Sequence, residues 1–281
     1  MSFPVIVSEI AVAVVQKAER SLMPIQLEKK IIFVFPHKDS GLISDSTYDR
    51  LQDMQSGLQS SNSFSQIRFL SRTEVKGDAR TSLLGKVRSI MHEMEHEVAQ
   101  KSPRLSGQWL VMDGAIRKQE FIGLENTIGL AKSFSRKPFI SINGSPMTLS
   151  AYMRNIKEGE RSAVLRKESP TDQVSKDIIF WYERIRTFPP MEPLGGIVKI
   201  DMKAPDGNVK QETVELIDEI SSEIYDMRLP SIYPWPRWPS YVYPIRIAEM
   251  YMSSTFLGEF VLRQIGEEMK NEIETTPSKK A

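Results

Sequence analysis

The chain has 281 residues, 40% of them hydrophobic and 26% charged, with a formal net charge of +1 and no cysteine. This composition is ordinary for a globular protein with a substantial core, and the small net charge gives no general attraction to nucleic acid. The absence of cysteine excludes disulfides, thiolate zinc sites and cysteine nucleophiles. No stretch reaches the ~18 apolar residues of a membrane helix, so we expect a cytoplasmic protein without membrane contact.

The first part of the chain is predicted to mix helices with strands. Residues 6–22 are apolar but carry Glu9 and no basic leader, which predicts a buried helix and not a signal peptide. The run KKIIFVF (29–35) predicts a strand that Pro36 stops. The next predicted elements are a helix over 45–59 with Asp45 as N-cap, a strand over 65–71, an amphipathic helix over 81–100 and a buried strand over 108–114.

The second part of the chain continues the same mixture up to a long final helix. The predicted elements are strands near 127–133 and 137–143, a short helix over 147–157, strands over 177–185 and 195–205, a helix over 211–225, a proline- and aromatic-rich loop over 229–244 and a helix over 245–270. We therefore expect an α/β fold with a mixed sheet flanked by helices. One domain is predicted over 1–270, followed by a flexible tail over 271–281.

The stretch His92-Glu93-Met94-Glu95-His96 matches the H-E-x-x-H pattern of zinc proteases. Helical periodicity places both histidines opposite the apolar face of their helix. That face comprises Leu83, Leu84, Val87, Ile90, Met91, Met94 and Val98. The only other histidine is His37, and no third ligand is marked out. The pattern therefore favours two solvated histidines over a zinc peptidase.

The stretch QWLVMDG (108–114) predicts a buried strand that ends in an Asp-Gly pair. Such a strand delivers the carboxylate of Asp113 to the edge of a sheet, where a ligand can reach it, and Gly114 then permits a tight turn. An ordinary Asp-Gly turn is the alternative. The preceding helix offers Glu93, Glu95 and Glu97, and one of these with Asp113 would make an oxygen site suited to Mg²⁺ or Mn²⁺. Paired ions of this kind activate water in phosphodiester cleavage.

Two later stretches add candidate phosphate contacts. Lys132 follows the predicted strand TIGLA and could neutralise a phosphate, although a plain surface lysine is an alternative. Tyr243 and Pro244 come directly before the last predicted helix, which carries Arg246 in its first turn. The alternative there is an ordinary helix start with apolar packing.

Taken in order, the stretches WLVMDGAI, NTIGLAKSF, IIFWYERI with GGIVKIDMKAP, and YPIRIAEMYM resemble the NurA family of nucleases. The resemblance covers about residues 80–260. It implies an RNase H-like, Piwi-like core, Mn²⁺-dependent (or Mg²⁺-dependent) cleavage of DNA, a homodimer, and partnership with the HerA hexameric DNA translocase. Residue by residue, it implies Asp113 as a metal aspartate, Lys132 and Tyr243 as catalytic residues, and Glu95 or a neighbour as the helix ligand.

The chain departs from the family pattern at the end of its first predicted strand. The family has an Asp-Gly there, whereas this chain has PHKDSG, so Asp39 would have to supply the ligand from about four residues further on. A metal-dependent nuclease in DNA end processing or in defence against foreign DNA is the leading prediction. A catalytically weak or inactive subunit with a structural role in a translocase complex is the alternative.

The loop YPWPRWPSYVYP places Arg237 and Trp238 among further aromatic residues. Aromatic side chains beside arginine stack unpaired bases, and the same residue types dominate protein interfaces. The loop therefore predicts either nucleic-acid binding or a contact with a protein partner.

Overall fold

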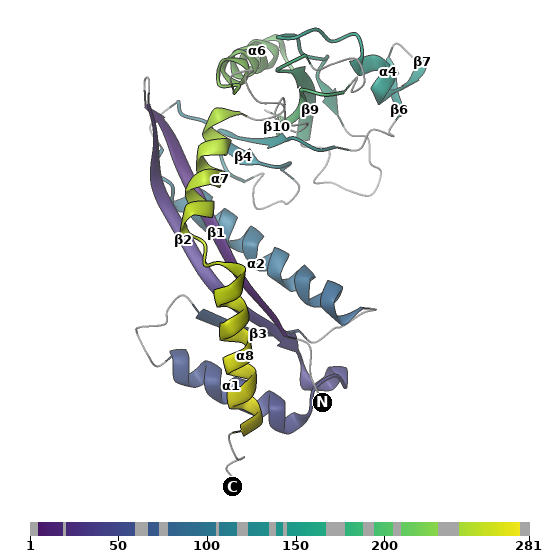
Figure 1. The fold of residues 1–281 in the computed structure, drawn as a ribbon. Coiled ribbons are helices and arrows are strands. Elements are labelled where there is room, and N and C mark those ends of the chain that lie inside the picture. The colour runs from purple at the N-terminus through teal and green to yellow at the C-terminus, as the bar shows by residue number, and fades with distance from the viewer. Residues whose placement is uncertain are drawn as a thin grey trace. The chain divides into compact units, whose positions relative to one another are not determined.

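The structure is a computed structural model that describes residues 5–18, 21–59, 67–72, 78–104, 107–116, 123–134, 139–142, 145–166, 178–187, 194–204, 209–229 and 242–275. The chain divides into two compact units. Unit 1 comprises Met1–Gln16, Met23–Ser102 and Ala248–Ala281, and unit 2 comprises Lys17–Leu22 and Pro103–Ile247. Both combine strands with helices, which confirms the expected mixed α/β class (Figure 1). In the described part of the chain, no helix is both long and apolar enough to cross a membrane.

Unit 1 is built on a sheet with the strand order β1-β2-β3. Its elements are the larger parts of β1 (Ile6–Ala18), β2 (Ser21–Pro36) and α7 (Tyr243–Thr255), together with the 3-10 helix η1 (Lys38–Ser40), α1 (Asp45–Gln59), β3 (Ile67–Arg72), α2 (Ala79–Lys101) and α8 (Glu259–Thr275). Strand β2 pairs with β3 in parallel, from Ile31 opposite Ile67 to Pro36 opposite Arg72. The predicted strands 29–35 and 65–71 are thereby confirmed.

Helices cover both faces of this sheet, which explains the unbroken apolar run in β2 (Figure 1). Ile32 and Val34 point toward α2, whereas Phe33 and Phe35 point toward α1 and α8. All four side chains are buried. A parallel strand covered on both faces carries a continuous apolar run and no alternation.

The prediction of a helix over 6–22 is wrong, because β1 occupies most of that stretch. Ile6, Ile10 and Val12 pack toward α2, while Val7 packs on the other face with the cluster around Phe33. An apolar run of this kind fits a buried helix and a strand buried on both faces equally well by periodicity. Its many β-branched residues favour the strand.

Unit 2 contains a mixed five-stranded sheet with the order β4-β5-β10-β9-β8. Its elements are β4 (Leu110–Asp113), β5 (Thr127–Ala131), β6 (Phe139–Ile142), β7 (Ser145–Thr148), α4 (Leu149–Met153), β8 (Leu165–Arg166), β9 (Ile178–Arg184), β10 (Ile197–Lys203) and α6 (Gln211–Asp226). Strands β4 and β5 are parallel, and every other pair in this sheet is antiparallel. Strands β6 and β7 form a separate antiparallel pair.

Helix α6 lies over one face of the unit 2 sheet (Figure 1). The core on that face comprises Ile128, Leu130, Ile179, Trp181, Val198, Ile200 and Met202 from the strands, and Ile217, Ile220 and Ile224 from α6. On the opposite face, α4 contributes Leu149 and Met153 to a cluster around Tyr182. The sheet is therefore buried between layers on both sides.

The single helix predicted over 245–270 is interrupted, because α7 ends at Thr255 and α8 begins at Glu259. The side chain of Glu9 is 2% exposed and accepts a hydrogen bond from the backbone N–H of Leu257 at 2.6 Å. Lys29 forms an ion pair with Glu9 at 2.6 Å and donates to the carbonyl of Thr255 at 2.6 Å. These tertiary contacts satisfy backbone groups that a continuous helix would pair internally.

The helix over 45–59 is confirmed, but Asp45 is its first helical residue and does not act as its N-cap. The hydroxyl of Ser44 accepts the backbone N–H of Thr47 at 3.2 Å, which is the contact that a capping side chain makes. At the other end of the chain, α8 continues to Thr275, into the stretch predicted as a tail.

Candidate functional site

Asp113 and Lys132 lie together at one edge of the unit 2 sheet. Because β4 and β5 are parallel and Asp113 pairs in register with Leu130, their carboxyl ends reach the same edge. The Nζ atom of Lys132 lies 3.0 Å from Oδ2 of Asp113. The two side chains remain 21% and 45% exposed, respectively, so an anion in solution can reach them.

The backbone beside Asp113 depends on two glycines. Gly114 has φ of 121°, a conformation that L side chains rarely adopt, and its N–H donates to the carbonyl of Leu130 at 2.8 Å. A Cβ atom on Gly129 would lie 2.6 Å from the carbonyl oxygen of Gly114 and 2.7 Å from the backbone nitrogen of Ile116. The tight turn predicted from the Asp-Gly pair is therefore present, and Gly129 on the neighbouring strand makes room for it.

The other two predicted metal ligands belong to unit 1 and have local partners. Oε2 of Glu95 lies 2.9 Å from Nδ1 of His92, one turn away on α2. Asp39 in η1 lies 3.0 Å from Nδ1 of His37, and its side chain is 72% exposed. Among the residues that the structure describes, no three His, Asp or Glu side chains are grouped as metal ligands would be. The set of Asp113, Glu95 and Asp39 stays a prediction.

The predicted apolar face of the helix that carries the H-E-x-x-H stretch is confirmed. The buried residues of α2 are Ser82, Leu83, Val87, Ile90, Met94, Val98 and Ala99. The side chain of His92 is 43% exposed and His96 is partly exposed, so both lie off the buried face. Asp78 caps this helix and accepts the backbone N–H of Thr81 at 2.8 Å. The hydroxyl of Thr81 also donates to Asp78 at 2.7 Å, and this hydrogen bond, followed by the one from the backbone, lowers the pKa of Asp78.

Tyr243 lies at the first position of α7, where it is 46% exposed and its N–H donates to the carbonyl of Met227 at 2.7 Å. Arg246 lies in the first turn of the same helix. The remaining predicted nucleic-acid contacts, Arg237 and Trp238, lie outside the described residues.

Sequence reasoning missed two consecutive residues of β9, Glu183 and Arg184, which are charged and buried. The guanidinium of Arg184 donates to the carbonyls of Ile156, Gly195 and Met153 at 2.5, 3.1 and 3.1 Å, which holds the neighbouring loops. Burial lowers the pKa of Arg184 and raises that of Glu183 to about 8. The available signal was a Glu-Arg pair inside the otherwise apolar strand IIFWYERI, since charged residues are rarely buried without partners.

A third buried charged residue, Asp201, lies on the opposite face of the sheet from Glu183. It is 2% exposed, pairs in register with Gly129, and accepts from Nζ of Lys199 at 2.9 Å. Lys199 also lies 4.5 Å from the ring centroid of Phe180. Burial, and secondly the charge of Asp201, raise the pKa of Tyr182 to about 12, so this phenol stays protonated at neutral pH.

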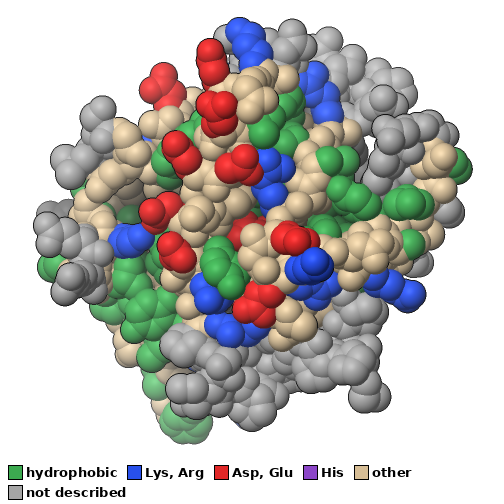
Figure 2. All heavy atoms as spheres, turned by 90° about the horizontal axis from the view of Figure 1, so that it is seen from above, with side chains coloured by type: hydrophobic (Ala, Val, Ile, Leu, Met, Phe, Trp, Pro, Cys, Tyr) green, Lys and Arg blue, Asp and Glu red, His purple; other side chains and the backbone are tan. Residues whose placement is uncertain are grey.

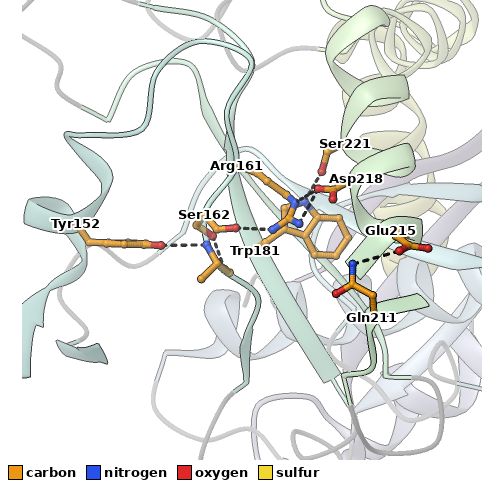
Figure 3. A network of polar contacts seen from close by, with 9 residues as sticks. Tyr152, Arg161, Ser162, Trp181, Gln211, Glu215, Asp218 and Ser221 are labelled. Carbon is orange, nitrogen blue, oxygen red and sulfur yellow. Dashed lines mark hydrogen bonds and ion pairs between the residues drawn. The ribbon is translucent and has the colours of Figure 1, made fainter. Parts of the chain in front are cut away.

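Polar contacts tie α6 to the edge of the sheet near β9 (Figure 3). Nε1 of Trp181 donates to the hydroxyl of Ser221 at 2.9 Å, and Nε of Arg161 donates to Asp218 at 2.6 Å. On the other side of Arg161, the phenol of Tyr152 accepts the backbone N–H of Ala163 at 3.0 Å. The contact between α6 and the sheet therefore contains both apolar packing and charge.

The outer face of α6 is acidic, and Figure 2, which looks onto this part of the molecule, shows acidic side chains gathered there. The exposed acidic residues of α6 are Glu212, Glu215, Asp218, Glu219, Glu223 and Asp226. Like charges repel, so a phosphate backbone is disfavoured on this surface. An anionic ligand of unit 2 is better placed at the sheet edge that carries Lys132.

Comparison with known proteins finds no family model that matches the chain and no curated protein that is similar to it.

Proposed function

We propose that this protein is a metal-dependent DNA nuclease of the NurA type, acting with a HerA-like translocase in DNA end processing or in defence against foreign DNA. The observation that carries the proposal is the pairing of Asp113 with Lys132 at the shared carboxyl end of parallel strands β4 and β5. The RNase H-like, Piwi-like topology, the homodimer and the cytoplasmic location are parts of the same proposal.

Lys132 would bind the phosphate that is to be cleaved. Its ammonium lies at a sheet edge, is partly exposed, and is held in place by Asp113 at 3.0 Å. A fixed cation of this kind stabilises the negative charge that develops on phosphate oxygens during cleavage. Tyr243 and Arg246 at the start of α7, with Arg237 and Trp238, are the further DNA contacts in this proposal. DNA binding would weaken as salt rises.

The described residues of unit 2 do not by themselves fit a divalent ion. Asp113 is the only predicted ligand in that unit, and Lys132 already neutralises its carboxylate. Hard divalent ions take several oxygen ligands, usually from more than one carboxylate. We therefore assign Lys132 to the phosphate and Asp113 to the positioning of Lys132, and the assay below measures the requirement for Mn²⁺ or Mg²⁺.

A non-catalytic subunit of a translocase complex is the second candidate function. It is favoured by the same pairing of Asp113 with a lysine, and by the local pairing of Asp39 with His37 in η1. A carboxylate that is held by a cation is a weaker metal ligand than a free one, because the charges compete. This candidate predicts binding to DNA or to a translocase without metal-stimulated cleavage.

The test is a cleavage assay with the full chain on end-labelled single-stranded and double-stranded DNA, with Mn²⁺, with Mg²⁺ and with EDTA. Asp113→Asn and Lys132→Met are each expected to lower the rate by roughly a hundredfold or more, which is typical for a lost charge-stabilising group. The matched control is Glu267→Gln, which removes an exposed ion pair with Arg263 on α8. Equal rates in the wild type and both site variants would refute the nuclease role of this edge.

A separate measurement distinguishes the two candidates. The wild-type chain is mixed with a HerA-type translocase and DNA, and complexes are detected by size-exclusion chromatography with light scattering, which also reports the homodimer. Complex formation without any metal-dependent cleavage would support the non-catalytic subunit. Cleavage that EDTA abolishes would support the nuclease.

A further inference from the structure

Glu183 is a buried carboxylic acid between the sheet and α6. It is 1% exposed and pairs in register with Val198 of β10. Ser221 on α6 forms a hydrogen bond with its carboxyl group, but Oε2 has no hydrogen-bond partner among the residues that the structure describes. A carboxylate with one buried oxygen unpaired is strongly disfavoured, and the neutral acid is less so.

Ser221 can give Glu183 only limited support. Its hydroxyl accepts the N–H of Trp181 at 2.9 Å (Figure 3), so its single proton is left for Glu183. One hydroxyl donor does not replace the hydration that an ionised carboxylate loses on burial. Burial therefore outweighs Ser221, and it also outweighs the positive charge of Arg161, so that the pKa of Glu183 rises to about 8.

Arg161 lies directly opposite Glu183 but is paired with another acid. An isolated antiparallel bridge joins the two residues, so their side chains leave the backbone on the same face. The guanidinium of Arg161 contacts Oδ1 of Asp218 through both Nε and Nη2 at 2.6 Å (Figure 3). Arg161 is 17% exposed and Asp218 on α6 is 59% exposed at the side chain. The exposed acid thus holds the arginine that the buried acid would need on ionisation.

Glu183 and Asp218 compete for the guanidinium of Arg161. The charged or titratable groups facing Glu183 in the described structure are Arg161, on the segment before β8, and Asp218, on α6. From β10 its neighbour is the apolar Val198. While Glu183 is neutral, Arg161 and Asp218 hold α6 to the sheet edge.

We propose that the contact between α6 and the sheet is a pH-sensitive switch, in which Arg161 moves from Asp218 to Glu183 when Glu183 loses its proton. The exchange removes one tie between α6 and the sheet, so α6 opens more readily in alkaline solution. The direction of the change in stability follows from linkage, because a raised pKa means that the folded state keeps the proton up to a higher pH than the unfolded state does. Stability is therefore lost as pH rises from about 4.5 to about 8.

Hydrogen exchange of the α6 amides at pH 6.5 and 9.0, corrected for the intrinsic exchange rate, tests the switch. If opening exposes Glu183, the equilibrium constant for opening should rise roughly thirtyfold between these pH values, from the two pKa values. Glu183→Gln, which cannot ionise, should show no such rise. Glu219→Gln, on the exposed side of α6, is the matched control and should behave as the wild type.

Two further results decide whether the arginine takes part. In the wild type, ¹³C NMR of the Glu183 carboxyl should titrate near pH 8, a readout that does not depend on any variant folding. Asp218→Asn frees Arg161, so this titration should move to lower pH. A Glu183 titration near 4.5, or α6 protection in the wild type with no more pH dependence than in Glu183→Gln, would overturn the switch. An unchanged midpoint in Asp218→Asn would overturn the exchange of Arg161.

Discussion

Replacing Gly129 by alanine tests how closely β5 approaches the backbone that follows Asp113. The added Cβ atom would lie 2.6 Å from the carbonyl oxygen of Gly114, 2.7 Å from the backbone nitrogen of Ile116 and 2.7 Å from Oδ1 of Asp201. Real Cβ atoms essentially never show contacts below 3.0 Å, so all three neighbours would have to move. Two of them are backbone atoms, and Asp201 is 2% exposed, so none can move freely.

The expected loss of unfolding free energy is large for the addition of a single methyl group. Overpacking a well-packed interior usually costs about 1–3 kcal/mol. Three simultaneous contacts, two of them with backbone, place Gly129→Ala near the upper end, at about 3 kcal/mol of unfolding free energy. Relief requires displacement of the backbone from Gly114 to Ile116, which directly follows Asp113. The variant is therefore expected to disturb the pairing of Asp113 with Lys132 as well.

The assay is urea unfolding followed by far-ultraviolet circular dichroism, with Gly258→Ala as the control. A Cβ on Gly258 meets no atom within 4 Å, so the same chemical change there should cost far less. If Gly129→Ala unfolds within about 0.5 kcal/mol of the wild type, which is the usual range of surface substitutions, the close approach of β5 to Gly114 is refuted.

Two further substitutions test single structural roles by the same unfolding measurement. Arg184→Met removes the donor shared by three carbonyls and should cost about 3 kcal/mol, because each buried acceptor left unpaired is destabilising; a loss below about 0.5 kcal/mol would show that other donors replace the guanidinium. Ser44→Ala should cost about 1 kcal/mol through loss of the cap of α1, and Asp45→Ala should cost less; the reverse order would restore Asp45 as the cap.

The sequence by itself determined those features that depend only on residues close together along the chain. The strand over 29–35, the buried face of α2 and the end of β4 at Asp113 follow from apolar periodicity and from the Asp-Gly pair, which are local signals. The contact of Asp113 with Lys132 requires knowledge of the strand pairing as well. It follows once the two strands are parallel neighbours, because parallel strands end at the same edge.

Tertiary contacts decided the features that the sequence predicted wrongly. The stretch 6–22 is apolar enough for either a helix or a strand, and its place beside β2 makes most of it a strand. The helix predicted over 245–270 has no strong local stop. Its break follows from Glu9 and Lys29, which bind backbone groups 248 and 226 residues away in the chain, respectively.

The acids and the arginine near α6 show why such features could not be found from sequence. Arg161 precedes β8, Glu183 lies on β9 and Asp218 lies on α6, and no spacing along the chain relates them. Their competition arises from the antiparallel bridge and from the packing of α6 on the sheet. The sequence determined which residues can be charged. Only the fold decided which carboxyl is kept from water, because solvation and pairing depend on neighbours in space.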